Sequence, residues 1–276
     1  MYYLIVIFLG VIGAAMGSFA GATVWRMHKK MDFLKDRSEC EHCHHKLSVL
    51  DLVPVFSWLF LRGRCRYCHK KIGVITLLLE IATAAIFILS FIFWPLGQLY
   101  VGSGTFDTLQ AIAFTIWLAM VVFMVMLLAY DYQWKLLPNR LMFPLIGITI
   151  IFSLLNNIFI QNITLLNSIY LMVLGLIPIT GVYGLIYMFS NGRLIGFGDV
   201  KFGIVAGMLL GWQGALFVLV IANLLGSLIT LPMLLCGKMK MDSQMAFGPF
   251  LIAATLAVFL FQESLMQFAT NNLLLR

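Results

Sequence analysis

Charged residues are scarce in this chain of 276 amino acids, since only 11% are Asp, Glu, Lys or Arg while 62% are hydrophobic. A soluble domain is nearer to about 25% charged. The five histidines all lie within residues 26–73, and the sequence contains no Gly-x-Ser-x-Gly, His-Glu-x-x-His or P-loop motif. A serine–histidine protease working within the apolar segments would therefore have no obvious base.

Long apolar runs take the place of the missing charge. Several approach the ~20 residues that a helix needs to cross a bilayer. The first run has no basic start and is longer than a signal-peptide core, so we expect it to stay in place as a helix. The sequence predicts about eight transmembrane helices, at residues 2–25, 74–93, 109–129, 141–160, 168–190, 200–212, 214–235 and 247–262.

The predicted fold class is an all-α polytopic membrane protein with a cytosolic loop domain. We expect transmembrane helix 1 at residues 1–25, the loop domain at 26–73 and the remaining transmembrane domain at 74–276. With the N-terminus outside, the cytosolic loops and adjoining helix ends contain 17 of the 18 Lys and Arg residues. The positive-inside bias favours this orientation. The net charge of +7 then reflects membrane topology and gives no sign of nucleic-acid binding.

The loop domain contains two Cys-x-x-Cys pairs, separated by 21 residues. Two such pairs match the four-thiolate zinc pattern, in which each pair places two sulfurs on one side of a tight turn. Disulfides or free thiols are the alternatives, and a cytosolic location argues against disulfides. A loop this small buries little core, so a closed, structural zinc site would supply much of its folding energy. The predicted ligands are Cys40, Cys43, Cys65 and Cys68.

Two aspartates occur where predicted helices meet the cytosolic face. Asp131 lies where the third helix exits, and Asp199 lies where the sixth begins, within "GFGDVKFG". If the two carboxyl groups face each other, they can share a proton, so that one activates a water and the other polarises a carbonyl. Alternatively, Asp199 is a helix N-cap and Asp131 is a solvated loop residue. Glu80, inside the second span, is either functional or a hydrogen-bonded structural group.

Glycines flank the second aspartate. Gly196 and Gly198 remove side chains beside Asp199, so that an extended substrate backbone could approach closely. We group them with Lys201, in the same turn, as substrate-approach or support residues. In the first helix, Gly13, Gly17 and Gly21 predict close helix packing.

Taken together, these features resemble the type IV prepilin peptidases, membrane aspartic proteases of the Gly-x-Gly-Asp type. The resemblance covers nearly the whole chain, although Ala20 and Gly21 depart from the family pattern after "GSF", and the usual proline is missing from "WRMHKK" (25–30). The matching blocks are "GSF" (17–19), the two Cys-x-x-Cys pairs, "DLVPVFSWLFLRGRCRYC" (51–68), "LLLEIAT" (77–83), Asp131 with "LPNRL" (137–141), "GFGDVKFG" (196–203), "GWQ" (211–213) and "FGPFL" (247–251).

The resemblance implies an activity, a partner and a location. It implies that Asp131 and Asp199 are catalytic, and that residues 74–276 form a peptidase domain removing the basic leader of prepilins or pseudopilins after a glycine. It also implies a bacterial cytoplasmic membrane and, in many members, methylation of the new N-terminus from S-adenosylmethionine. The two departures lie in the N-terminal region associated with methyl transfer, which leaves peptidase activity alone as the alternative. A proton-coupled transporter using Asp131, Asp199 and Glu80 as a proton relay is the competing class, and it predicts inverted repeats, which the sequence does not show.

Overall fold

The computed structural model describes residues 2–31, 39–40, 42–43, 45–96, 99, 107–237 and 246–273. Within these ranges the chain is helical, and its only β-pairing is two isolated bridges, Glu39 with Lys46 and Arg64 with Lys71. Asp242, in the last predicted cytosolic loop, and Arg276, the one basic residue expected outside, fall beyond the described ranges.

The predicted multi-pass helical architecture is confirmed. Six helical segments in the described ranges are long and apolar enough to cross a membrane. They are α1 (Tyr2–Lys29), α3 (Val74–Ile92), α4 (Thr108–Trp134), α5 with a π-helical turn (Asn139–Leu154 and Leu155–Ile160), α6 to α7 through a second π-helical turn (Leu165–Leu176, Ile177–Gly181 and Val182–Ser190), and α8 (Phe197–Leu235).

The helices at the last three predicted spans, residues 200–212, 214–235 and 247–262, each contain a break or a bend. The sixth and seventh predicted spans are the two halves of α8, which meet at Gly211 (φ 66°, ψ −177°), the first residue of the predicted turn. This conformation is nearly restricted to glycine, and the chain reverses there. Tyr183 interacts with both Asp199 and Asn223, which would lie about 36 Å apart in a straight helix. The last predicted span is α9 (Gly248–Leu260), bent by 81° against α10 (Gln262–Leu273), and the pair counts as a seventh span if taken together.

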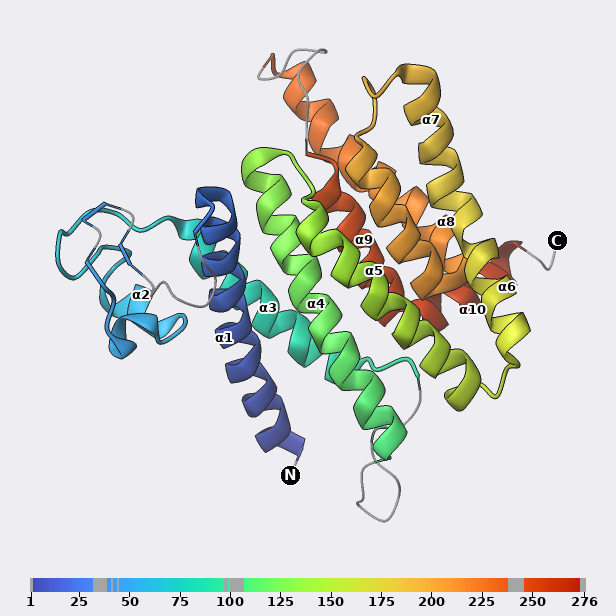
Figure 1. Cartoon of the computed structure of the whole chain (residues 1–276), viewed down its shortest axis with the longest axis horizontal. Coiled ribbons are helices and arrows are strands. Elements are labelled where there is room, and N and C mark those ends of the chain that lie inside the picture. Colours follow the sequence, from blue (N-terminus) through green and yellow to red (C-terminus); the bar gives the residue numbers. More distant parts are fainter. Residues whose placement is uncertain are drawn as a thin grey trace. The chain divides into compact units, whose positions relative to one another are not determined.

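The chain divides into two compact units, and the first contains residues 1–92 with residues 121–129 of α4. In this unit α1 and α3 pack side by side (Figure 1). A Cβ atom at Gly17 would lie 2.7 Å from the Cα of Glu80, and one at Gly13 would lie 2.7 Å from the Cα of Ala84. The close packing predicted from the small residues of α1 is therefore confirmed at these two positions.

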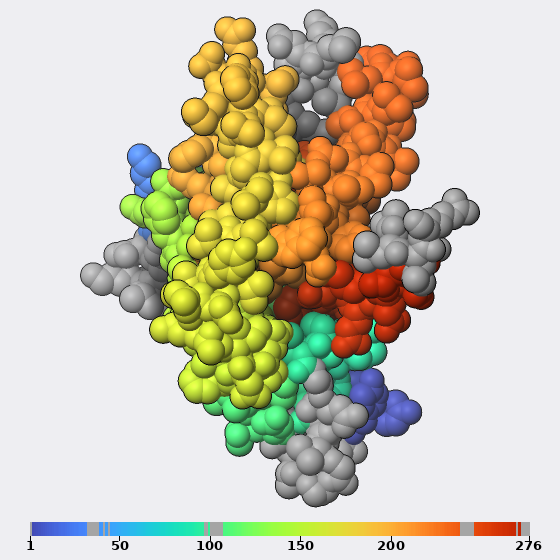
Figure 2. All heavy atoms as spheres, turned by 90° about the vertical axis from the view of Figure 1, so that its right-hand side faces the viewer, coloured from blue at the N-terminus to red at the C-terminus, as the bar shows by residue number. Residues whose placement is uncertain are grey.

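The second unit contains residues 93–120 and 130–276 and is built around α8. Helices α5, α6, α7 and α9 all contact α8. Figure 2 shows the yellow α6 lying against the orange α8, with α9 and α10 in red beside them. An aromatic core joins α4, α5 and α9, where the rings of Trp117 and Phe259 stack at 3.7 Å and Phe152 packs against both.

Substituting Gly17 tests the packing of α1 on α3. Gly17→Ala forces backbone apart, whereas Gly21→Ala is the matched control, because its Cβ would lie 3.6 Å from a flexible Leu79 methyl. We expect Gly17→Ala to lower the free energy of unfolding by about 1–3 kcal/mol and Gly21→Ala to leave it nearly unchanged. Denaturant unfolding of the purified protein in mixed micelles measures both, and equal stabilities would contradict the packing described.

Candidate active site and cysteine cluster

Asp131 lies in the last turn of α4, where the helix is closed by a left-handed residue. Lys135 adopts φ 54° and ψ 41°, and its backbone N–H donates to the Asp131 carbonyl oxygen at 2.7 Å. The side chain of Asp131 is only 5% exposed. The solvated-loop alternative for this residue is therefore wrong, since the carboxyl group is buried inside the helical unit.

Asp199 lies in the first turn of α8, which begins after Gly196. Gly196 is the N-cap residue, with the extended backbone that this position requires (φ −74°, ψ 147°), and Asp199 is the third helical residue. The alternative that Asp199 is itself the N-cap is therefore wrong. Its carboxyl group is turned back so that it faces the backbone N–H of Gly196, an arrangement typical of an acid at the third helical position.

The fold brings the two aspartates together. Their carboxyl groups are close enough to interact electrostatically, and both are buried, with Asp199 only 9% exposed. The carboxyl group of Asp131 faces the backbone N–H of Gly248 at the start of α9. Its Oδ2 atom is buried and has no hydrogen-bond partner among the described residues. An unpaired buried carboxylate oxygen is costly, so this atom is suited to bind a water, a proton or a polar ligand.

Leu137 packs between the glycines that adjoin these two acids. A Cβ atom at Gly198 would lie 2.9 Å from the Cβ of Leu137, and one at Gly248 would lie 3.5 Å from its Cδ1 and 2.6 Å from Asp131 Oδ2. The space left by Gly198 is thus filled by Leu137, while Gly196 faces the Asp199 carboxyl group. These contacts fix the first turns of α8 and α9 against the end of α4.

Lys201 anchors the same turn of α8 from the outside. Its Nζ atom donates a hydrogen bond to Asn139 Oδ1 at 2.7 Å and lies 4.6 Å from the ring centroid of Phe197. Asn139 is the first residue of α5. Lys201 therefore joins the beginnings of α5 and α8, and Phe197 packs under its ammonium group and against the ring of Tyr187 in α7.

Four further residues at this site were not assigned a role from the sequence. Leu137, Asn139 and Gly248 lie within the quoted blocks "LPNRL" and "FGPFL", which were a usable signal. No signal in the sequence pointed to Tyr183, because a single hydroxyl in an apolar helix is common. Its side chain is buried, accepts a hydrogen bond from Asn223 Nδ2 at 3.0 Å and interacts electrostatically with Asp199.

The four predicted cysteine ligands form one cluster in the first unit. All four sulfur atoms lie within 4.8 Å of one another, and the Sγ atoms of Cys40 and Cys68 are 3.8 Å apart. In a tetrahedron with metal–sulfur bonds of ~2.3 Å, sulfurs are separated by about 3.8 Å. The cluster therefore fits a single tetrahedral metal ion, and none of its cysteines is in a disulfide.

The two cysteine pairs share one backbone design. In each, the N–H of the first cysteine bonds the carbonyl oxygen five residues later, from Cys40 to His45 at 3.0 Å and from Cys65 to Lys70 at 2.9 Å. An antiparallel bridge closes each turn just outside this bond. These tight turns point both thiols of a pair to one side, as a shared ion requires.

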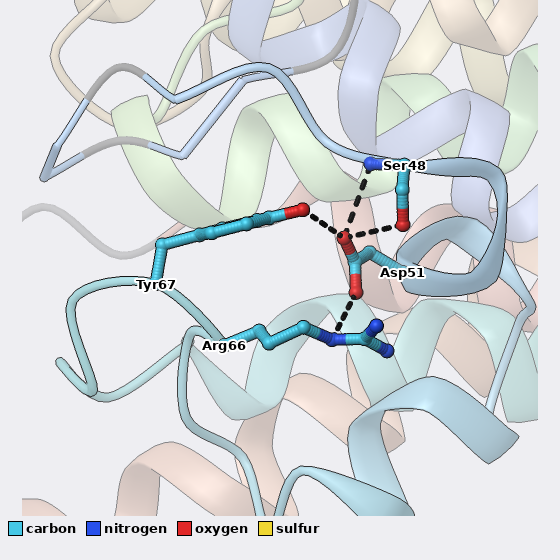
Figure 3. A network of polar contacts seen from close by, with 4 residues as sticks. All are labelled: Ser48, Asp51, Arg66 and Tyr67. Atoms are coloured by element: carbon cyan, nitrogen blue, oxygen red, sulfur yellow. Dashed lines mark hydrogen bonds and ion pairs between the residues drawn. The ribbon is translucent and has the colours of Figure 1, made fainter.

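A polar network holds the second knuckle to the preceding segment (Figure 3). Asp51 accepts hydrogen bonds from the Ser48 hydroxyl at 2.8 Å and from the Tyr67 hydroxyl at 3.2 Å, and pairs with Arg66 Nε at 2.9 Å. Burial alone would raise the pKa of Asp51, but these partners outweigh it and hold that pKa below its usual value. The ring of Tyr67 also lies 3.7 Å from that of His45, which joins the two knuckles.

Glu80 belongs to the first unit. It is 5% exposed in α3, and its Oε2 accepts a hydrogen bond from the backbone N–H of Val55 at 2.7 Å. The sequence left Glu80 as either a functional group or a hydrogen-bonded structural group, and the structure shows it hydrogen-bonded. A proton relay through all three acids has no support in these contacts.

The fold and site define a class: an all-helical, multi-pass membrane protein with two buried aspartates at helix ends and a four-cysteine loop. Residues 118–231 match the type IV leader peptidase family, and residues 11–94 match the bacterial peptidase A24 N-terminal domain. The chain belongs to the type IV leader peptidase family.

Curated relatives agree with this assignment. Proteins named prepilin leader peptidase/N-methyltransferase are 29% identical in Dichelobacter nodosus, over 95% of this chain and 93% of that protein, and 28% identical in Dickeya chrysanthemi, over 84% and 75%. One from Pectobacterium carotovorum is 26% identical over 88% of both chains. No solved structure matches this chain.

Gly248→Ala tests the packing around Asp131. The added Cβ would lie 2.6 Å from the buried Oδ2, whereas at Gly147, in α5, nothing lies within 4 Å of a new Cβ, which makes Gly147→Ala the matched control. We expect Gly248→Ala to cost about 1–3 kcal/mol of stability and Gly147→Ala to be neutral or slightly stabilising. Thermal unfolding in detergent measures both, and an unchanged midpoint for Gly248→Ala would contradict the contact.

Proposed function

We propose that this protein is an aspartic endopeptidase that removes the basic leader of prepilins or pseudopilins, cutting after a glycine at the cytosolic face of a bacterial cytoplasmic membrane. The observation that carries the proposal is the meeting of two buried carboxyl groups, Asp131 and Asp199, at the ends of α4 and α8. The naming of the relatives gives the substrate class.

The chemistry follows from two acids in one buried site. Like charges this close do not both ionise cheaply, so the pair shares one proton. The ionised carboxylate takes a proton from a water, which attacks the scissile carbonyl carbon, while the protonated carboxyl group polarises the carbonyl oxygen. The same proton, or the one just taken up, then passes to the leaving amine as the C–N bond breaks. The unpaired Oδ2 of Asp131 supports a water-binding role for this residue.

The surrounding residues have supporting roles in this proposal. Gly196 keeps the space beside Asp199 free of a side chain, so an extended substrate backbone can approach. Gly198 admits Leu137, which holds the acids' helices together, and Lys201 fixes the first turn of α8 through Asn139. These are positioning roles, distinct from the proton transfers assigned to the aspartates.

The proposed orientation suits this substrate. With the N-terminus outside, the ends of α4 and α8 that contain the two acids lie at the cytosolic face. A substrate with a basic leader in the cytosol and an apolar helix in the bilayer would present its leader junction at that depth.

Methylation of the new N-terminus is the second proposed activity. It rests on the naming of the relatives and on the matched N-terminal domain. S-adenosylmethionine is the proposed methyl donor, and the departures at Ala20, Gly21 and "WRMHKK" leave a peptidase without methyl transfer as the alternative.

Replacing either aspartate tests the peptidase proposal. Asp131→Asn or Asp199→Asn removes an ionisable group but keeps the shape, so we expect the protein to insert normally and kcat for leader cleavage to fall by about 10²–10⁴-fold. Asp107→Asn is the matched control, because Asp107 caps the opposite end of α4 by accepting from the Leu109 N–H at 3.0 Å, a role that Asn also fills. Cleavage of a purified prepilin in detergent is the assay, and wild-type cleavage by either site variant would refute the mechanism.

For the cysteine cluster we propose structural zinc. Four thiolates in tetrahedral spacing close the coordination sphere and leave no position for substrate. The metal would stabilise a loop whose own apolar core is small. It supplies no step in the cleavage proposed here.

Cysteine substitution tests this assignment. We expect Cys40→Ser to lose bound zinc and to lower the melting temperature, while the cleavage rate per folded molecule stays close to wild type. Cys236→Ser, at the exposed end of α8, is the control and should retain about one zinc per chain. Metal analysis and melting curves are the measurements. A zinc-depleted protein that keeps its melting temperature but stops cleaving would assign the metal to catalysis.

A further inference from the structure

An apolar patch lies on the part of the loop domain between the two cysteine knuckles. Two short helices, η1 (Val49–Leu52) and α2 (Phe56–Phe60), form it. Phe60 is 83% exposed and Val49 is 82% exposed, although both lie outside the predicted spans. We call this surface the loop patch, and its exposed residues are Val49, Leu50, Leu52, Val53, Phe56, Leu59 and Phe60. An exposed apolar surface of this kind in a water-facing loop calls for a partner.

The hydrogen bond from Val55 to Glu80 sets the depth of the loop patch. Glu80 lies six residues after Val74, the first residue of α3, which is about 9 Å along the helix axis. Helical side chains point back toward the N-terminus of their helix, so the Glu80 carboxyl group reaches from there toward the cytosolic end of α3. Because Val55 bonds this group at 2.7 Å, the centre of the loop patch lies level with the first apolar turns of α3. Amphipathic segments at a bilayer surface lie about 5–10 Å deep.

The backbone at Val55 is strained, and the hydrogen bond to Glu80 stabilises it. Val55 has φ 62° and ψ −53°, and the Phe56 N–H bonds the Pro54 carbonyl oxygen at 2.6 Å, which closes a tight γ-turn. A positive φ is unfavourable for a β-branched residue, and this turn is rare. Glu80 accepts the N–H of the residue at the centre of the turn. The loop is thus held against α3 at a local cost, with η1 on one side of the turn and α2 on the other.

Basic residues follow directly after the loop patch. A surface hollow of about 440 Å³ is lined by Phe60, Leu61, Arg62, Arg64, Cys65, Arg66 and His69. Arg66 is paired with Asp51, which leaves Arg62 and Arg64 as the arginines that face an added anion. Guanidinium groups suit phosphate oxygens, which they can bind in pairs. Apolar side chains bordered by arginines complement a leaflet with anionic phospholipids, whose acyl chains and phosphates occur in the same order.

We propose that the loop patch is inserted at the boundary between headgroups and acyl chains of the cytosolic leaflet, with Arg62 and Arg64 bound to anionic phospholipid headgroups. The Glu80–Val55 hydrogen bond positions the patch at this depth. The loop domain is then a peripheral membrane element, attached to the bilayer by the turn between its two cysteine knuckles and by the helices on either side.

Photo-crosslinking of the full-length protein tests the proposal. The photoreactive residue p-benzoylphenylalanine replaces Phe60, an exposed aromatic, in liposomes of phosphatidylethanolamine and phosphatidylglycerol that also contain a prepilin. The matched control has the same residue at His42, which is exposed in the first knuckle. We expect lipid adducts at position 60, a preference for phosphatidylglycerol, and little lipid adduct at position 42. Mass spectrometry identifies the adducts. Predominant adducts to prepilin, to the rest of the same chain or to a second copy would each overturn the proposal, as would equal lipid labelling at the two positions.

A second pair of variants tests the positioning by Glu80. In the Phe60 photo-crosslinking background, Glu80→Leu removes the acceptor for Val55, and Glu80→Gln keeps a carbonyl oxygen at the same place. We expect Glu80→Leu to lose most of the lipid adduct and Glu80→Gln to retain most of it. Melting curves show whether either variant is unfolded. Folded variants with undiminished lipid adducts in both cases would show that this hydrogen bond does not set the depth of the patch.

Discussion

The structure depends on holding two carboxyl groups together in a place where each is costly to bury. Asp131 and Asp199 are 68 residues apart in the chain, yet they interact within one compact unit. Their approach requires three backbone segments to meet, at the end of α4 and at the starts of α8 and α9. Small residues make this possible, because a side chain at Gly198 or Gly248 would collide with Leu137 or with Asp131 itself. The geometry of the acid pair is therefore a property of backbone packing as much as of the acids.

The first unit also buries an acid beside a close approach of two helices. There the buried carboxyl group of Glu80 accepts a backbone N–H from a strained turn, and α1 approaches its backbone closely through Gly17. In both units a buried acid lies beside a glycine that lets a neighbouring helix approach. In the second unit, Asp131 keeps a carboxylate oxygen without a hydrogen-bond partner among the described residues, which suits binding of a water or a ligand. In the first unit, the carboxyl group of Glu80 is hydrogen-bonded, which suits a structural role.

Much of this was predictable from the sequence because the strongest signals are local. Apolar run length predicted the helical spans, and the spacing of Cys40, Cys43, Cys65 and Cys68 predicted the cluster that the structure brings together. The joining of the two halves of α8 through Gly211 alone was not predicted, because a single glycine in a backbone conformation that other residues avoid can reverse the chain without a longer turn. Tyr183 and the wedge of Leu137 were missed for another reason. Their importance comes from contacts between distant segments. A lone Tyr in an apolar helix gives no sign of such contacts, and the block "LPNRL" marks the segment of Leu137 without indicating what the side chain touches.

The most direct test is an experimental structure of the full-length protein in a lipid nanodisc with an uncleaved prepilin bound. We predict that the scissile carbonyl group lies between the side chains of Asp131 and Asp199, with a water in hydrogen-bonding contact with one of them. A scissile bond bound elsewhere, or aspartates separated by a helix or placed at opposite membrane faces, would contradict the account.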